Sequence, residues 1–202
     1  MIMLVLLVMS GLAPFDRTTW WLEIFPILIA VPLLILTHKT FPLTPLLCFL
    51  IFLHCIVLMV GGRYSYARVP LGFWIAELFD WHRNPYDKIG HFFQGFVPAL
   101  VAREIFIRKS VIQDSKTLAF ICVCVVMAIS ASYELIEWAS ALIMGQGADE
   151  FLGTQGDPWD TQSDMFMALV GAIVALMALS RLHDRQISRL PSVQAGSTSG
   201  VT

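Results

Sequence analysis

The sequence predicts an all-α membrane protein: a polytopic helix bundle of about six transmembrane helices, with a short interfacial helix in an outer loop. Two observations indicate this class. The 202 residues are 57% hydrophobic and only 14% charged, whereas a soluble domain usually carries about 25% charged residues. The apolar residues are also gathered in stretches, and five of these stretches are close to the roughly 20 residues with which a helix crosses a bilayer.

The apolar stretches predict the spans in their order along the chain. The first, residues 1–14, is short, and it lacks both a basic segment in front of it and an A-x-A-like cleavage site. A short first span is therefore favoured over a cleaved signal peptide, and both interpretations stay open. The longer stretches are residues 18–37, 43–62, 89–107, 117–144 and 162–180.

Two segments outside the predicted spans have a distinctive amino-acid composition. Residues 69–81 (VPLGFWIAELFDW) lie in a long loop and are rich in aromatic residues, which predicts an interfacial helix. The end of the chain is small and polar, which is typical of disorder. We therefore expect a single transmembrane helical domain over residues 1–182 and a disordered cytoplasmic tail over residues 183–202.

Lysine and arginine residues in short loops predict the orientation of the bundle. The loop RKSVIQDSK after the fourth stretch is basic, and so is the tail with Arg181, Arg185 and Arg189. Both are expected in the cytoplasm, and six spans with both termini inside fit this pattern. One loop conflicts with it, because residues 63–88 then lie outside although they include four basic residues.

Two glutamates interrupt the fifth apolar stretch and are the strongest functional signal in the sequence. Glu134 and Glu137 are three residues apart, so they share one face of a helix. A carboxylate in hydrocarbon is costly, and it usually faces a partner or a water-filled cavity. Rise per residue places Glu137 roughly 10 Å, and Glu134 roughly 15 Å, below the outer end of the span.

Two more polar pairs open the neighbouring spans. Asp87 and His91 are four residues apart at the outer start of the fourth stretch, and Asp160 and Asp164 have the same spacing at the start of the sixth. All three pairs are expected to converge in one cavity in the outer half of the membrane. Structural interpretations stay open beside this one: Asp87 and Asp160 as helix N-caps, and His91 as a hydrogen-bonded packing residue.

Five carboxylates and one imidazole cannot all stay charged and uncompensated in a low-dielectric site. Either some of them are protonated or a cation lies among them. Mixed carboxylate and histidine ligands suit Zn²⁺, Mn²⁺ or Fe²⁺, and an oxygen-rich set suits Mg²⁺. The predicted metal ligands are Asp87, His91, Glu134, Glu137, Asp160 and Asp164. Glu134 and Glu137 are also the predicted catalytic residues, because a carboxylate that does not bind the ion can act as general base.

Other polar residues in the apolar stretches are not expected to join this cluster. Glu104 lies thirteen residues beyond His91, roughly 20 Å closer to the cytoplasm, and is expected to pair with Arg108 four residues later. The histidines His54 and His183 have no obvious acidic cluster beside them.

Three blocks of the sequence resemble a known family. RNPYDKIGHFFQGFVPALVAREI, SYELIEWASA and FLGTQGDPWDTQSDM are similar to the YjdF-like bacterial inner-membrane proteins, a family of unknown function. The element D-K-x-x-H is also reminiscent, more weakly, of VanZ-like membrane proteins. The resemblance implies a multi-span protein of the bacterial inner membrane, and it implies neither a substrate nor catalytic residues.

The leading hypothesis for function is a metal-dependent hydrolase of lipid or lipid-linked substrates at the outer leaflet. One alternative is a proton- or cation-coupled transporter, because intramembrane acids commonly mark ion pathways. The other is a noncatalytic membrane assembly protein. The expected partners are membrane lipid and a small-molecule or lipid-linked substrate. No nucleic-acid partner is expected, since the net charge is −2 and the chain has no basic arm.

Overall fold

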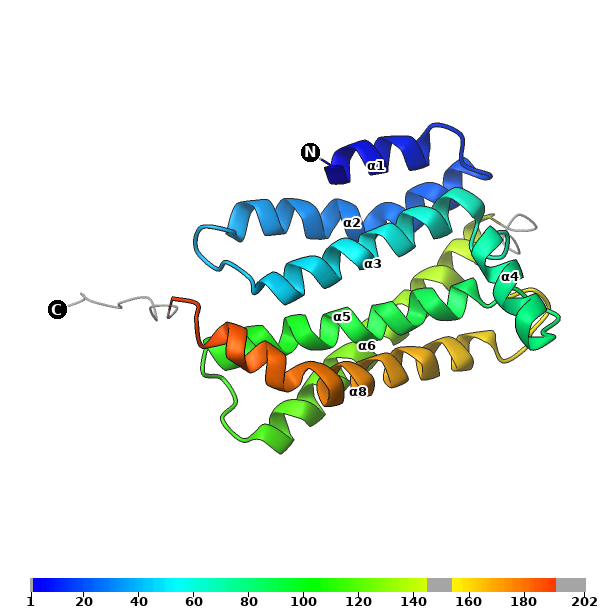
Figure 1. The fold of residues 1–202 in the computed structure, drawn as a ribbon. Helices are drawn as coiled ribbons and strands as arrows, with labels where there is room; N and C mark the ends of the chain where they lie inside the picture. Colours follow the sequence, from blue (N-terminus) through cyan, green and yellow to red (C-terminus); the bar gives the residue numbers. More distant parts are fainter. Residues whose placement is uncertain (1, 145–153, 192–202) are drawn as a thin grey trace.

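The computed structural model describes residues 2–144 and 154–191. Within these residues the structure has seven helices and no strand, which confirms the predicted all-helical class (Figure 1). The helices are α1 (Ile2–Gly11), α2 (Arg17–Thr37), α3 (Pro45–Tyr64), α4 (Pro70–Phe79), α5 (Tyr86–Arg108), α6 (Ser115–Met144) and α8 (Asp160–Ile187).

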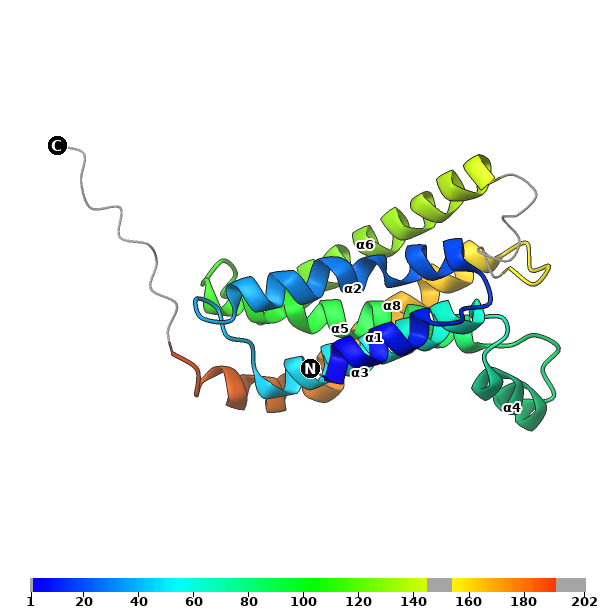
Figure 2. The ribbon, with the colours of Figure 1, turned by 90° about the horizontal axis from the view of Figure 1, so that it is seen from above.

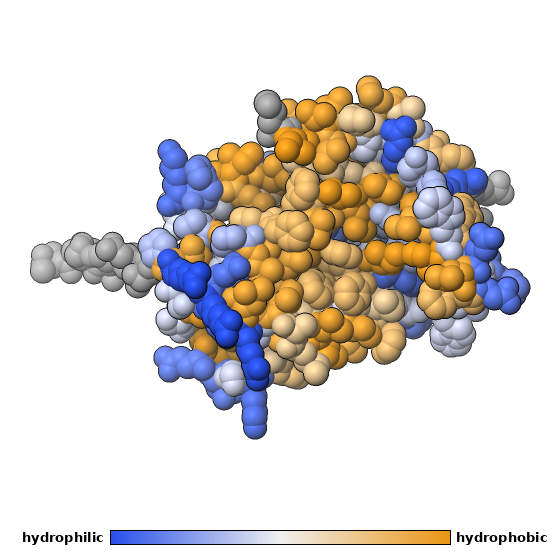
Figure 3. Space-filling view, viewed as in Figure 1, coloured by the Kyte–Doolittle hydropathy of each residue, from blue (hydrophilic) through white to orange (hydrophobic). Residues whose placement is uncertain are grey.

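The long helices match the predicted spans. Among the described residues, α2, α3, α6 and α8 are long and apolar enough to cross a membrane. α5 has a comparable length of 23 residues and carries charged residues near both ends. α1 has only ten residues, so it is about 15 Å long, half of the hydrocarbon thickness. Figure 3 shows the expected surface, with apolar side chains over the middle of the visible face and hydrophilic ones towards its two ends.

Local signals in the sequence set several helix boundaries. The Asp16 carboxylate accepts a hydrogen bond from the Thr19 N–H at 2.6 Å and caps the start of α2. Thr44 caps α3 in the same way, and Pro45 occupies its first turn, where a missing N–H costs nothing. The predicted interfacial helix is present as α4, which begins at Pro70.

The bundle has a polar region at each end of its long helices. We call them the Asp160 end, where α8 begins, and the Arg108 end, where α5 ends. α2, α5 and α8 begin at the Asp160 end, and α3 and α6 run in the opposite direction (Figure 1). α8 continues past residue 182, the expected limit of the helical domain, to Ile187. Residues 192–202 of the expected tail lie outside the described residues.

The closest packing in the bundle is between α5 and α8, and glycines make it possible. A Cβ atom on Gly95 would lie 1.8 Å from the carbonyl oxygen of Ala168, and one on Gly171 would lie 2.1 Å from that of Phe92. Small residues at such crossings let the backbones of membrane helices touch. The two helices run in the same direction, so their first turns lie side by side at the Asp160 end.

The other helices are arranged more loosely around this pair. α3 packs on α5, while α2 packs mainly on α3. α6 packs on both α5 and α8, and it diverges from them towards Met144 (Figure 2). The candidate site lies near the Asp160 end, where the first turns of α5 and α8 meet α6.

Candidate functional site

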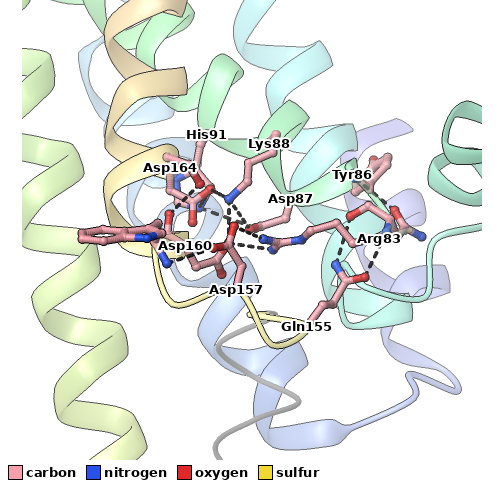
Figure 4. Close-up of polar contacts among 12 residues, drawn as sticks. Arg83, Tyr86, Asp87, Lys88, His91, Gln155, Asp157, Asp160 and Asp164 are labelled. Atoms are coloured by element: carbon pink, nitrogen blue, oxygen red, sulfur yellow. Dashed lines mark hydrogen bonds and ion pairs between the residues drawn. The ribbon is translucent and has the colours of Figure 1, made fainter. Parts of the chain in front are cut away.

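The three predicted pairs lie at one end of the bundle. Asp87 and His91 come from the first two turns of α5, and Asp160 and Asp164 come from the first two turns of α8 (Figure 4). Glu134 on α6 reaches the same place. All five side chains are buried. Neither Asp87 nor Asp160 caps its helix, because α5 is preceded by Pro85 and α8 by Trp159, and neither start has a side-chain cap; the N-cap interpretation is therefore wrong.

A network of ion pairs forms the outer layer of the site. The Lys88 ammonium lies 2.6 Å from one carboxylate oxygen of Asp160 and 2.6 Å from one of Asp164. The Arg83 guanidinium donates to the same Asp160 oxygen at 2.6 Å and to Asp157 at 2.8 Å. One oxygen of Asp160 thus contacts two cations, which Asp157 and Asp164 share.

The pKa of Arg83 reflects this pairing. Partial burial lowers it, but the hydrogen bond and the negative charge of Asp160 outweigh burial and hold the pKa of the guanidinium above its usual range.

His91 is the centre of the inner layer. Its Nε2 atom lies 3.5 Å from a carboxylate oxygen of Asp87 and 3.7 Å from one of Asp164, and its Nδ1 atom lies 3.8 Å from one of Glu134. Asp87, His91 and Asp164 each offer one ligand atom, and these three atoms lie within 4.8 Å of one another. This buried group has the composition and spacing of a site that can hold a metal ion.

The hydrogen bonds of the inner layer are incomplete. Among the described residues, no donor lies within hydrogen-bonding distance of the buried atoms Asp87 Oδ2 and Glu134 Oε1. The Lys88 ammonium is 4.0 Å from that Asp87 oxygen. Buried polar atoms are normally hydrogen-bonded, so two unpaired carboxylate oxygens beside one imidazole indicate room for a further donor or cation.

A small cavity of about 140 Å³ opens from His91 towards the middle of the bundle. Asp87, His91 and Gln94 line it from α5, and Tyr133 and Glu137 line it from α6. Glu137 is therefore half-buried in the cavity wall instead of lying within the three-residue group. The side-chain oxygen of Gln94 is 3.0 Å from His91 Nδ1.

A wider cavity of about 540 Å³ lies outside the ion pairs. Lys88 and Arg83 line it, together with Gln155 and Asp157 of the segment before α8. The Gln155 side chain bonds both the N–H and the C=O of Asn84, which ties this segment to the start of α5. Because Lys88 lines the outer cavity and Asp87 lines the inner one, the ion-pair network lies between them.

Comparison with known proteins agrees with this architecture. Residues 1–185 match the family described as predicted membrane protein DUF2238. The chain belongs to this family. It is 58% identical over 184 residues to the inner membrane protein YjdF of Escherichia coli strain K12, an alignment that covers 91% of this chain and 88% of that protein. No solved structure matches the chain. The resemblance to YjdF-like proteins is confirmed, and the chain is a multi-pass helical protein of the inner membrane.

Several residues of this DUF2238 site were not predicted from the sequence. Glu23 of α2 is buried and lines the inner cavity with Tyr66. The argument that selected Glu134 applies equally to Glu23, because it too is a carboxylate within an apolar stretch. Arg83 and Lys88 were not expected to hold the aspartates, since both lie in a loop by sequence and no pattern links them to α8.

The DUF2238 chain also contains a second buried polar cluster, at the Arg108 end. Glu104 is fully buried and accepts hydrogen bonds from the Thr44 hydroxyl at 2.8 Å and from Arg108 at 3.0 Å. The Nε2 atom of His183 lies 2.9 Å from the Glu104 oxygen that accepts from Thr44. The predicted pairing with Arg108 is confirmed, whereas the expectation that His183 has no acidic neighbour is wrong: α8 brings it to Glu104 from 79 residues away.

We expect this second cluster to hold the helices together without contributing to the first site. Glu104→Ala removes the acceptor of Thr44, Arg108 and His183, and breaking a buried pair in this way costs about 3–5 kcal/mol. Thermal unfolding of the purified variant in detergent should show the loss, while Glu77→Ala on the exposed face of α4 should unfold like the parent. An unchanged unfolding temperature for Glu104→Ala would mean that the cluster is not held as described.

Proposed function

We propose that the protein is a membrane-embedded, metal-dependent hydrolase of lipid or lipid-linked substrates, with a divalent cation bound at His91. The observation that carries the proposal is the buried group of Asp87, His91 and Asp164, whose ligand atoms lie within 4.8 Å of one another. Two oxygens bound to one ion are at most about 4.4 Å apart, twice a metal–oxygen bond. Small side-chain movements therefore suffice to close the site.

The charges around His91 favour a cation. Asp87, Asp164 and Glu134 all face the imidazole, and the ammonium of Lys88 is shared between Asp164 and Asp160. The unpaired Oδ2 atom of Asp87 is an acceptor that a divalent ion would use. Asp160 already holds Lys88 and Arg83, so we assign it to positioning instead of metal binding.

Gln94 orients the imidazole of His91 for binding a metal ion through Nε2. With its oxygen 3.0 Å from Nδ1, Gln94 accepts a hydrogen bond from the Nδ1–H tautomer. The lone pair of Nε2 then faces Asp87 and Asp164, the other two members of the group. Outer partners commonly fix the tautomer of metal-binding histidines in this way.

The remaining carboxylates supply the acid–base chemistry. A bound divalent ion polarises a phosphoryl or carbonyl oxygen and lowers the pKa of a water molecule. Glu137, which lines the cavity beside His91, is placed to accept the proton of that water as general base. Glu134 lies 3.8 Å from Nδ1 of His91, on the other side of the ring from Nε2, so we assign it to holding the imidazole and not to the ligand set.

The structure gives less support to the two alternative functions, a transporter and a noncatalytic assembly protein. A transporter requires polar groups that continue across the membrane, but the cavity beyond His54 is lined mainly by apolar side chains. A noncatalytic assembly protein gives no reason for buried carboxylate oxygens without hydrogen-bond partners, since buried structural networks are normally complete.

The first test is metal binding by the purified protein. Chelator-treated protein is equilibrated with Mn²⁺ or Zn²⁺, and bound metal is measured by elemental mass spectrometry. We expect one ion per chain, and an affinity in Asp87→Asn that falls by more than the roughly 10–100-fold that the loss of an outer partner of a ligand costs. Glu77→Gln, an exposed acid on α4, is the control.

The second measurement separates metal binding from chemistry. Glu137→Gln should retain the ion and lose about 10²–10⁴-fold in phospholipid hydrolysis, as expected for a missing general base. Wild-type protein that stays folded and takes up no divalent ion would overturn the proposal.

A further inference from the structure

A large apolar cavity lies beside the candidate site. It has a volume of about 660 Å³, is lined mainly by α2, α3 and α5, and is partly open to the outside of the bundle. Its lining includes Ala30 and Leu33 of α2 and Val97 and Val101 of α5. The volume falls in the range of about 300–1,000 Å³ that is usual for small-molecule sites.

This cavity adjoins the acid-lined cavity at His91. Four residues line both cavities: Pro26, His54, Leu58 and Pro98. Pro26 and Pro98 are interior prolines of α2 and α5, and such residues interrupt helix hydrogen bonding and can open space between helices. The two cavities are therefore separated only by the side chains that they share.

The dimensions of the apolar cavity match one leaflet of a bilayer. Its lining follows α2 from Pro26 to Thr37, which corresponds to about 16 Å of helix. The hydrocarbon core is about 30 Å thick, so this is roughly the depth that one lipid chain occupies. The far end is more polar, with Thr37, Thr40 and the exposed Lys109.

We propose that the apolar cavity holds one hydrocarbon chain of a membrane lipid whose polar head lies in the acid-lined cavity at His91. Two adjoining cavities, one lined by carboxylates and the other mainly by apolar side chains, have the same division as a lipid. The inference rests on the proposed function only for what happens to the head, because retention of the chain depends on the apolar walls and requires no metal.

The test uses a lipid probe with a reactive group in its chain. Full-length protein is placed in vesicles of phosphatidylethanolamine and phosphatidylglycerol that contain a little phosphatidylethanolamine with a diazirine in one acyl chain. After illumination, cross-linked residues are identified by mass spectrometry. We expect them on the cavity-lining faces of α2, α3 and α5.

Matched variants distinguish this cavity from ordinary lipid contact. Ala30→Trp and Val101→Trp place a bulky ring in the space proposed for the chain, and should reduce cavity cross-links about tenfold by steric exclusion. Leu36→Trp lies on the lipid-exposed face of α2, outside the cavity lining, and should leave them unchanged. Ala30→Leu, a milder filling, serves if a tryptophan variant does not fold.

The outcomes for the chain and for the metal can be told apart. Asp87→Asn should lose the ion and keep the cavity cross-links. Loss of metal binding would therefore not contradict the binding of a lipid chain in the apolar cavity. Cavity cross-links that persist in folded Ala30→Trp and Val101→Trp, or that occur only on outward-facing residues, would overturn it while leaving metal binding untouched.

Discussion

Gly95→Leu is expected to prevent α5 and α8 from packing as they do, with a large loss of stability. A Cβ atom at Gly95 would lie 1.8 Å from the carbonyl oxygen of Ala168, a backbone atom that cannot turn away. The helices must then separate, at a cost above the roughly 1–3 kcal/mol of ordinary overpacking. Thermal unfolding in detergent and yield of folded protein measure the effect.

The same substitution also probes the candidate site. Asp87 and His91 are held against Asp164 by the α5–α8 crossing, so metal binding should be lost together with stability. Ala178→Leu, on the lipid-exposed side of α8, is the control and should change stability by no more than about 0.5 kcal/mol. If Gly95→Ala were as stable as the parent, the backbones would have to lie farther apart than described.

Lys88→Met is expected to destabilise the metal-free protein by about 3–5 kcal/mol, because it leaves the buried Asp164 carboxylate without its cation and Asp160 with Arg83 alone. The Lys88 ammonium lies 2.6 Å from both Asp160 and Asp164. The variant also frees Asp164 to bind metal fully, so added Mn²⁺ should restore more stability than it adds to the parent. Unfolding temperatures with Mn²⁺ and with chelator measure both effects.

Lys116→Met is the control for Lys88→Met, since Lys116 is exposed in the first turn of α6. Its loss should leave the unfolding temperature unchanged both with Mn²⁺ and with chelator. Equal stabilisation of Lys88→Met and the parent by Mn²⁺ would show that the ion does not use Asp164. A metal-free Lys88→Met as stable as the parent would show that the aspartates are not charged in the folded protein.

The fold was largely predictable from composition and periodicity. Long apolar runs interrupted by short polar loops can satisfy their backbone groups in a membrane only as helices, which is why the predicted spans coincide with α2, α3, α5, α6 and α8. The aromatic segment that became α4 was recognised for the same kind of reason, by the match between its residues and an interface.

The candidate site was predictable only in part. Spacing along single helices identified Asp87, His91, Glu134 and Asp164, because residues three or four apart share a helix face. The spacing does not predict which faces of different helices come into contact. Lys88 bonding to Asp160 and Glu104 bonding to His183 join residues 72 and 79 positions apart, and no local pattern encodes such contacts.

The sequence by itself thus determined which segments cross the membrane and which polar side chains enter it, since both follow from the cost of placing polar groups in hydrocarbon. Only the tertiary structure decided how those side chains are combined. The glycine-mediated approach of α5 to α8 sets the rotation and depth of both helices. It thereby places Asp87, His91 and Asp164 within one small buried group and brings Lys88 into contact with Asp160 and Asp164. Glu137 lies outside this group, in the cavity wall.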